Sequence, residues 1–199
     1  MRSRFLAAFL VAVAAGAMTA SAGANPFYDP DGRFSGGRTT GGGFGGLFGR
    51  SSTIARTTVT YPSRLPYGSI VINTTERRLY LILGNGLAIR YGVGVGRAGF
   101  TWSGVKHVSA KREWPAWTPP AQMRRRRPDL PGHMAGGVEN PLGARAMYLG
   151  SSLYRIHGSN EPETIGQAVS SGCFRLTNED IVDLYNRVRV GAKVVVLRH

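Results

Sequence analysis

The chain has 199 residues, 42% of them hydrophobic, and its 25 Lys and Arg against 11 Asp and Glu give a net charge of +14. This length is sufficient for one folded domain, and a single cysteine excludes an internal disulfide. The charge suits a polyanionic neighbour, whether nucleic acid, an anionic membrane face or cell wall.

The first 24 residues have the pattern of a secretory signal. The basic start MRSR precedes the apolar run FLAAFLVAVAAGAM, and small residues offer cleavage sites at Ala20-Ser21-Ala22 and Ala22-Gly23-Ala24. The apolar run falls short of the roughly 20 residues that a membrane-spanning helix needs. We therefore predict a signal peptide over 1–24, an exported protein and no transmembrane anchor after cleavage.

Export argues against nucleic acid as a partner. The four consecutive arginines at 124–127 lie among prolines and lack interleaved aromatic residues, which is the pattern of a solvated basic loop rather than of specific nucleic-acid recognition.

Residues 25–65 are dominated by Gly, Ser, Thr and Arg, as in SGGRTTGGGFGGLFGRSS. Ordering so much glycine is entropically costly, and too few apolar residues are present to offset that cost. We predict a flexible leader over 25–65 and one folded domain over 66–199.

The predicted domain is mainly β. Short runs of strand-forming residues occur at 69–73, 78–83 and 87–96, and the turn Gly84-Asn85-Gly86 is typical of a hairpin. Further strands are predicted at 144–150, 153–158 and 193–197. The stretch GVGVGR at 92–97 resembles part of a dinucleotide-binding fingerprint, but no helical pattern follows it, so we discount that interpretation.

One helix is predicted shortly after the cysteine. Thr177 is placed to cap it, Asp180 completes a capping-box-like pair, and apolar residues follow at helical spacing until Gly191. Cys173 then lies just before a helix N-terminus, where the helix dipole favours a thiolate.

The stretch SSGCFRL contains Cys173, for which the residues leave two interpretations open. A free cysteine often behaves as a small buried hydrophobe; as a nucleophile it needs a base. Of the four histidines, His157 ends a predicted strand and precedes a glycine, a position where functional side chains are often displayed. A metal site is disfavoured because one cysteine with scattered histidines lacks paired ligand spacing.

The longer stretch IHGSNEPETIGQAVSSGCFRL strongly resembles the signature of the YkuD-type L,D-transpeptidases, the ErfK/YbiS/YcfS/YnhG family. In that signature a strand ends in His-Gly-(Thr/Ser), and a connector leads to Ser-x-Gly-Cys-x-Arg. The resemblance continues upstream in NPLGARAMYLG and downstream from TNEDIVDLY to VGAKVVVL, and so covers residues 66–197. Ser171 departs from the histidine that many members carry at this position, which bears on substrate preference.

The resemblance implies a β-sandwich or barrel with one helix following the catalytic cysteine. It also implies a periplasmic enzyme that acts on peptidoglycan stem peptides without cofactor or metal. Cys173 would be the nucleophile that releases D-alanine from a tetrapeptide stem, and His157 the proton donor and acceptor. The Gly158 backbone carbonyl would orient the histidine, and backbone N–H groups at Gly172 and Cys173 would stabilise the oxyanion.

Three further residues are candidates for substrate binding. Arg175 offers a guanidinium fork for a stem-peptide carboxylate, with a surface salt bridge as the alternative. Ser170 and Ser171 are the others, and Ser170 is equally suited to holding the cysteine loop.

Several functional alternatives stay open. The acyl acceptor is a second stem, water as in an L,D-carboxypeptidase, or an amine of an envelope protein. The non-enzymatic alternative is a basic wall-binding module with a buried cysteine. The stretch WPAWTPP at 114–120 is either core or a lid over the cleft.

Overall fold

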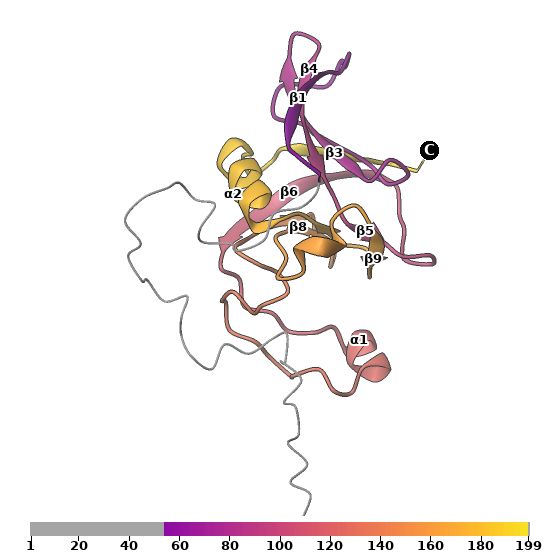
Figure 1. The fold of residues 1–199 in the computed structure, drawn as a ribbon, viewed down its shortest axis with the longest axis vertical. Coiled ribbons are helices and arrows are strands. Elements are labelled where there is room, and N and C mark those ends of the chain that lie inside the picture. Colours follow the sequence, from indigo (N-terminus) through magenta and orange to yellow (C-terminus); the bar gives the residue numbers. More distant parts are fainter. Residues whose placement is uncertain (1–53, 199) are drawn as a thin grey trace, which may run out of the picture.

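The computed structural model describes residues 54–198 (Figure 1), so the predicted signal over 1–24 and most of the predicted leader lie outside the described residues. In chain order the strands are β1 (Thr57–Thr60), β2 (Ile70–Asn73), β3 (Arg78–Gly84), β4 (Leu87–Gly92), β5 (Val95–Gly96), β6 (Gly104–Glu113), β7 (Arg145–Leu149), β8 (Arg155–His157), β9 (Ala168–Ser170), β10 (Phe174–Arg175) and β11 (Lys193–Leu197). The helical segments are α1 (Ala121–Arg126), the 3-10 turn η2 (Pro162–Thr164) and α2 (Asn178–Arg187).

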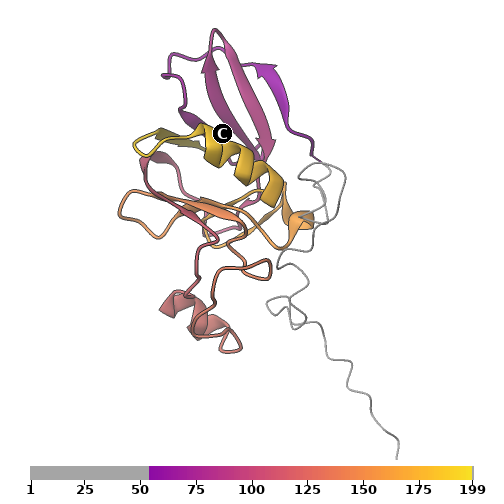
Figure 2. The ribbon, with the colours of Figure 1, turned by 90° about the vertical axis from the view of Figure 1, so that its left-hand side faces the viewer.

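The strands form a nine-stranded sheet in the order β1-β4-β3-β2-β11-β6-β7-β8-β10, and β5 pairs with β9 in a separate parallel pair. The C-terminal strand β11 lies in the middle of the large sheet, parallel to β2 and antiparallel to β6. Buried side chains from both halves of this sheet and from α2 form one hydrophobic core, and α2 lies across the sheet in Figure 2. The prediction of a mainly β domain is confirmed.

The predicted strands are all present, but the longest strand, β6, was not predicted beyond a strand-like segment around His107. Its sequence GVKHVSAKRE is largely exposed, and Val108 is its one fully buried side chain. A strand that buries so little apolar surface carries no alternating hydrophobic pattern to detect.

The folded chain begins earlier than the predicted leader boundary at 65. Strand β1 pairs antiparallel with β4 from Thr57 to Thr60. Beyond it, the ring of Tyr61 stacks on that of Tyr80 at 4.5 Å between centroids. The sequence of β1 has the composition of a linker because its threonines are polar and mostly exposed. The strand forms through pairing with β4 and not through burial of apolar side chains.

Helix α2 begins as predicted and ends sooner. The Thr177 side chain accepts a hydrogen bond from the Asp180 backbone N–H at 3.1 Å, whereas the helix ends at Arg187 and not at Gly191. Lys111 of β6 donates to the carbonyls of Tyr185 and Val188, each at 2.6 Å. This lysine satisfies two carbonyls at the end of the helix, where intrahelical donors are missing. Among residues 54–198 no helix is long and apolar enough to cross a membrane.

Residues 114–144 between β6 and β7 form an excursion, called here the basic excursion because it holds arginines 124–127. Figures 1 and 2 place its helix α1 away from the sheet, at one end of the molecule. Backbone hydrogen bonds in both directions pair Trp117 with Met134, and the buried Asn140 amide donates to the carbonyls of Pro115 and Ala135. The arginines were predicted in a loop; three of them lie on α1.

Candidate active site

The pairing of β8 with β10 decides which side chains meet. The two strands are parallel, with Ile156 opposite Phe174 and His157 opposite Arg175. Ile156 and Phe174 point into the core, with 0% and 1% of their surface exposed. Because side chains alternate along a strand, His157 and Arg175 point to the other face.

The same alternation places two more residues on that face. Arg155 lies two positions before His157, and Cys173 lies two positions before Arg175, so extending the register sets Cys173 opposite Arg155. We call the set Arg155, His157, Cys173 and Arg175 the β8–β10 face. Two residues far apart in the sequence, the cysteine and the histidine, become diagonal neighbours on it.

His157 is 4% exposed and held from its Nδ1 side. This nitrogen lies 2.6 Å from the carbonyl oxygen of Gly158. A carbonyl oxygen only accepts, so Nδ1 carries the proton and Nε2 is left as the basic nitrogen. Burial, then the positive charge of Arg175, lowers the pKa of His157 to about 3, and the carbonyls of Gly158 and Pro141 only partly oppose this. The imidazole is therefore neutral at neutral pH.

Cys173 is half-buried and free, with its Sγ 3.7 Å from the Leu153 carbonyl oxygen. Burial raises the pKa of its thiol; hydrogen bonding to Arg155 and the charges of Arg155 and Arg175 act in the lowering direction. Strand β10 separates Cys173 from α2. In the free protein a neutral thiol, diagonal to a neutral imidazole, thus takes the place of the thiolate that the sequence predicts at a helix N-terminus.

The loop that carries Cys173 is clamped by Ser170. The Ser170 hydroxyl donates to the Cys173 carbonyl at 2.6 Å and accepts from the Gly172 N–H at 3.1 Å. Ser170 is 3% exposed, so both capacities of its hydroxyl serve the loop. The Gly172 N–H, predicted as an oxyanion donor, is occupied by this bond, which leaves the Cys173 N–H as the other predicted donor.

Gly172 itself is required by its surroundings. Its φ is +106°, and a Cβ at this position would lie 2.7 Å from Cε1 of Tyr154. The Trp102 indole N–H donates to the Gly172 carbonyl at 2.9 Å, and the Trp102 and Tyr154 rings stack with centroids 4.7 Å apart. Trp102 and Tyr154 thus pack together against the cysteine loop at Gly172, a role that the sequence did not indicate.

The two other predicted substrate-binding residues have partners of their own. Arg175 forms a salt bridge with Glu161, with Nη1 and Oε2 2.8 Å apart, which matches the alternative interpretation of this arginine. The Ser171 hydroxyl lies 3.4 Å from Nη1 of Arg97. The structure therefore brings Ser171 together with an arginine that the sequence did not single out.

Asn178, at the start of α2, is a positioning residue that sequence reasoning missed. Its Oδ1 accepts from the Ala144 N–H at 2.8 Å, and a Cβ on Gly143 or Gly158 would collide with it. It therefore joins the Asn-Pro-Leu-Gly segment to the histidine strand. Arg155 was also missed, although its place two residues before His157 on one strand was a usable signal.

Among residues 54–198 no three His, Cys, Asp or Glu side chains are grouped to hold a metal ion. What the described side chains offer is a cysteine just before β10 and a carbonyl-anchored histidine at the end of the neighbouring strand β8, an arrangement suited to nucleophilic chemistry.

Residues 67–196 match the YkuD family, the L,D-transpeptidase catalytic domain, and the chain belongs to that family. Among curated relatives, the probable L,D-transpeptidase ErfK/SrfK of Escherichia coli is 39% identical over 137 residues, or 64% of this chain and 43% of that protein. The probable L,D-transpeptidase YbiS of Escherichia coli is 41% identical over 134 residues, or 63% and 43%. The matches span less than half the length of these relatives.

Solved structures share the fold. L,D-transpeptidase 3 from Mycobacterium tuberculosis, in complex with a faropenem-derived adduct, has a TM-score of 0.53 at 18% identity, covering 67% of this chain and 61% of that one. A Brucella melitensis chain named a probable carnitine operon oxidoreductase is 44% identical, with a TM-score of 0.51, covering 75% of this chain and 98% of that one. In the present structure GVGVGR runs through β5 into a turn and then β6, without the helix that a dinucleotide fingerprint requires.

Proposed function

We propose that the chain is an exported L,D-transpeptidase that acts on peptidoglycan in the periplasm. The observation that carries the proposal is the β8–β10 register, which sets Cys173 diagonal to His157, with Nδ1 of His157 anchored on Gly158. Membership of the family supports the reaction class.

In the first half-reaction, Nε2 of His157 takes the thiol proton as Sγ of Cys173 attacks the carbonyl that joins diaminopimelate to terminal D-alanine. The carbonyl π electrons move to oxygen, where the Cys173 N–H stabilises the negative charge; one such donor is worth about 3 kcal/mol. The C–N bond then breaks. The imidazolium gives its proton to the leaving amine, so that D-alanine departs and a thioester remains.

In the second half-reaction an acceptor amine attacks the thioester. His157 takes a proton from this amine, the C–S bond breaks, and the thiolate recovers a proton from the imidazolium. Both groups thus begin and end neutral, in agreement with the pKa shifts of the free protein. The guanidinium of Arg155, beside the sulfur, stabilises the transient thiolate in both half-reactions.

Mass spectrometry of the protein incubated with purified disaccharide-tetrapeptide tests the proposal. We expect a mass increase on Cys173 equal to the stem minus D-alanine. Adding a second stem, a lysine-bearing envelope peptide or buffer alone then distinguishes transpeptidase, ligase and carboxypeptidase by the product mass. An unmodified cysteine that also resists thiol reagents would instead favour the non-enzymatic wall-binding module.

A further inference from the structure

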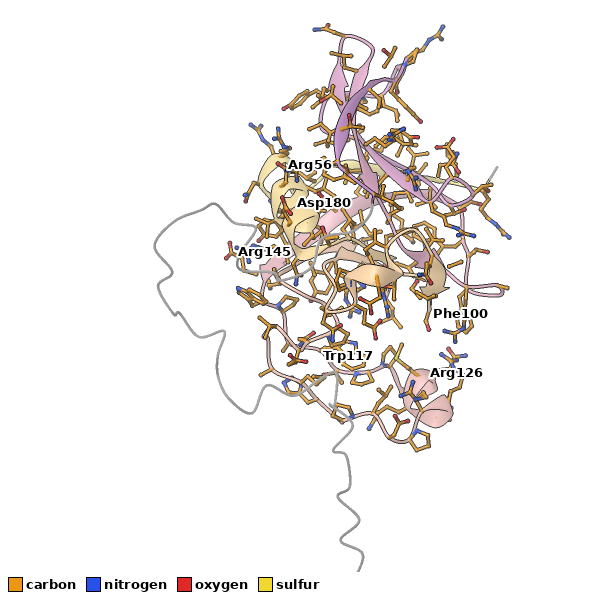
Figure 3. The ribbon with its side chains drawn as sticks, viewed as in Figure 1. Arg56, Phe100, Trp117, Arg126, Arg145 and Asp180 are labelled. Carbon is orange, nitrogen blue, oxygen red and sulfur yellow. The ribbon has the colours of Figure 1, made fainter. Side chains whose placement is uncertain are left out.

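The loop that follows β5 presents an aromatic ring to two arginines. The Phe100 ring centroid lies 4.3 Å from Cζ of Arg97 and 5.0 Å from Cζ of Arg126. Arg97 directly follows β5, whereas Arg126 lies at the end of α1 in the basic excursion. Figure 3 shows Phe100 next to Arg126 at the edge of the molecule. We call these three residues the arginine pair and its ring.

Arg97 and Phe100 both contact the cysteine loop, and Arg126 reaches it through Phe100. The Arg97 N–H donates to the Ser170 carbonyl at 3.0 Å, and its Nη1 lies 3.4 Å from the Ser171 hydroxyl. The Phe100 carbonyl oxygen lies 3.1 Å from where a Cβ on Gly172 would be. A ligand group held by the two arginines would therefore lie within reach of a substrate bound at Cys173.

The charges of the arginine pair are not balanced within the described chain. Arg97 is half-buried and Arg126 exposed, and neither forms a salt bridge with a carboxylate among residues 54–198. Each cation–π contact contributes only about 0.5–1 kcal/mol at such sites, while two like charges on one ring repel each other. An anion that binds both guanidinium groups would offset the two charges and accept hydrogen bonds from two forks.

The anion that fits this reaction is a carboxylate. Arg175, which the sequence singled out for that task, is already paired with Glu161 at 2.8 Å. Diaminopimelate carries a free carboxylate on its second centre, beyond the carbonyl that the cysteine attacks. A stem with lysine at this place has the amine but lacks that carboxylate.

We propose that Arg97 and Arg126 form a subsite for the side-chain carboxylate of diaminopimelate, and that Phe100 holds the two guanidinium groups in place. The subsite rests on the proposed function and makes the enzyme selective for stems with diaminopimelate over stems with lysine. It assigns to the basic excursion a part in substrate recognition, through one arginine of its helix.

Binding is measured by calorimetry on the full chain with Cys173→Ala, which prevents turnover. The ligands are the disaccharide-tetrapeptide and the same molecule with its diaminopimelate side-chain carboxylate converted to an amide. We expect amidation to weaken binding about 10- to 100-fold, the range for losing a charged hydrogen bond. Arg97→Gln and Arg126→Gln should each weaken binding of the acid by a similar factor and leave binding of the amide nearly unchanged.

Arg124→Gln is the matched control, because it removes the same charge from the same helix, whereas it is Arg126 that lies over the Phe100 ring. It should bind the acid like the parent. Arg97→Lys, which keeps the charge without the fork, should give an intermediate loss. If both glutamine variants still distinguish acid from amide as the parent does, the subsite is wrong.

Acylation of the wild-type cysteine by the acid stem separates this failure from failure of the proposed function. If Cys173 is acylated but the arginine variants still bind the acid more tightly than the amide, as the parent does, only the subsite is overturned. A cysteine that the stem never acylates overturns the proposed function, and the subsite with it.

Discussion

The β8–β10 face and the attachment of α2 both gather charged side chains, but only at the second do opposite charges pair with one another. The α2 anchor consists of Arg56, Tyr91, Asp180, Asp183 and Arg187. There, Arg56 lies 3.2 Å from an Asp180 oxygen, the Tyr91 hydroxyl donates to Asp183 at 2.7 Å, and Arg187 donates to both Asp183 oxygens. Figure 3 labels Arg56 and Asp180 where they meet beside α2.

On the β8–β10 face the bonding is incomplete. The Nε atoms of Arg155 and Arg175 are buried and have no hydrogen-bond partner within the described part of the chain. Burial lowers the pKa of His157 and raises that of Cys173, so that the neutral form of each group is favoured. Paired charges hold elements together, whereas desolvated groups with unused bonding capacity cost stability and are characteristic of reactive sites. Changes on the β8–β10 face should therefore act most strongly on acylation, and changes at the α2 anchor on the free energy of unfolding.

The largest expected effect is on catalysis. Cys173→Ser should abolish the acyl-enzyme mass, because a hydroxyl beside this imidazole is a far weaker nucleophile than a thiol. His157→Gln keeps the volume and a donor for the Gly158 carbonyl but removes the base, and should slow acylation about 10²- to 10⁴-fold. The exposed histidines provide the controls, His107→Gln and His133→Gln, which should acylate at the wild-type rate. Rapid acylation of the His157 variant would contradict its assigned role.

The next effect concerns stability at the α2 anchor. A chain lacking residues 1–65 loses β1 and leaves the buried Asp180 without Arg56, whereas one lacking residues 1–53 keeps both. We expect the longer deletion to lower the free energy of unfolding by about 2 kcal/mol or more, the Arg56 part being discounted for its partial exposure. Urea titrations of the two chains measure the difference. Equal midpoints would mean that β1 and Arg56 do not hold the fold.

The two regions should also respond oppositely to acid. The pKa of His157 falls from 6.5 to about 3 on folding, so the unfolded chain takes the proton first and stability is lost as pH falls below 6.5. The pKa of Asp180 rises from 3.8 to about 6, chiefly through burial, so the folded chain takes that proton first and gains stability as pH falls from 6. Each slope is about 1.4 kcal/mol per pH unit.

Urea unfolding between pH 4 and 6 separates these slopes. Asp180→Asn should lose stability more steeply on acidification than wild type, and His157→Gln less steeply. Parallel curves for all three proteins would show that neither group changes its proton affinity on folding.

The smallest effect separates the two serines of the cysteine loop. Ser170→Ala leaves the Gly172 N–H and the Cys173 carbonyl unpaired, at a cost of about 1–3 kcal/mol, and should slow acylation about tenfold with little change in stem affinity. Ser171→Ala loses one long contact with Arg97 and should acylate almost normally. Saturation kinetics of acylation give both quantities. A loss of affinity in Ser170→Ala would restore its predicted part in substrate binding.

Local chemistry made much of the molecule predictable from sequence. The strand runs, the Gly-Asn-Gly hairpin and the Thr177 cap depend on neighbours a few residues away, so their patterns are visible in the chain itself. The same holds for the motif around His157 and Cys173. Patterns based on burial fail where pairing alone makes the structure, as in β1 and β6.

What the residues alone determined was the identity of the nucleophile and base candidates, the mainly β class and the family. Tertiary structure decided their relations: that β11 lies between β2 and β6, and that β8 pairs in register with β10 to bring Cys173 to His157. It also decided that Ser170 bonds within the cysteine loop and that Arg175 pairs with Glu161. Arg97 and Arg126 both lie against the ring of Phe100. These contacts join segments distant in the chain, and their partners are set by packing and strand register, which no local pattern records.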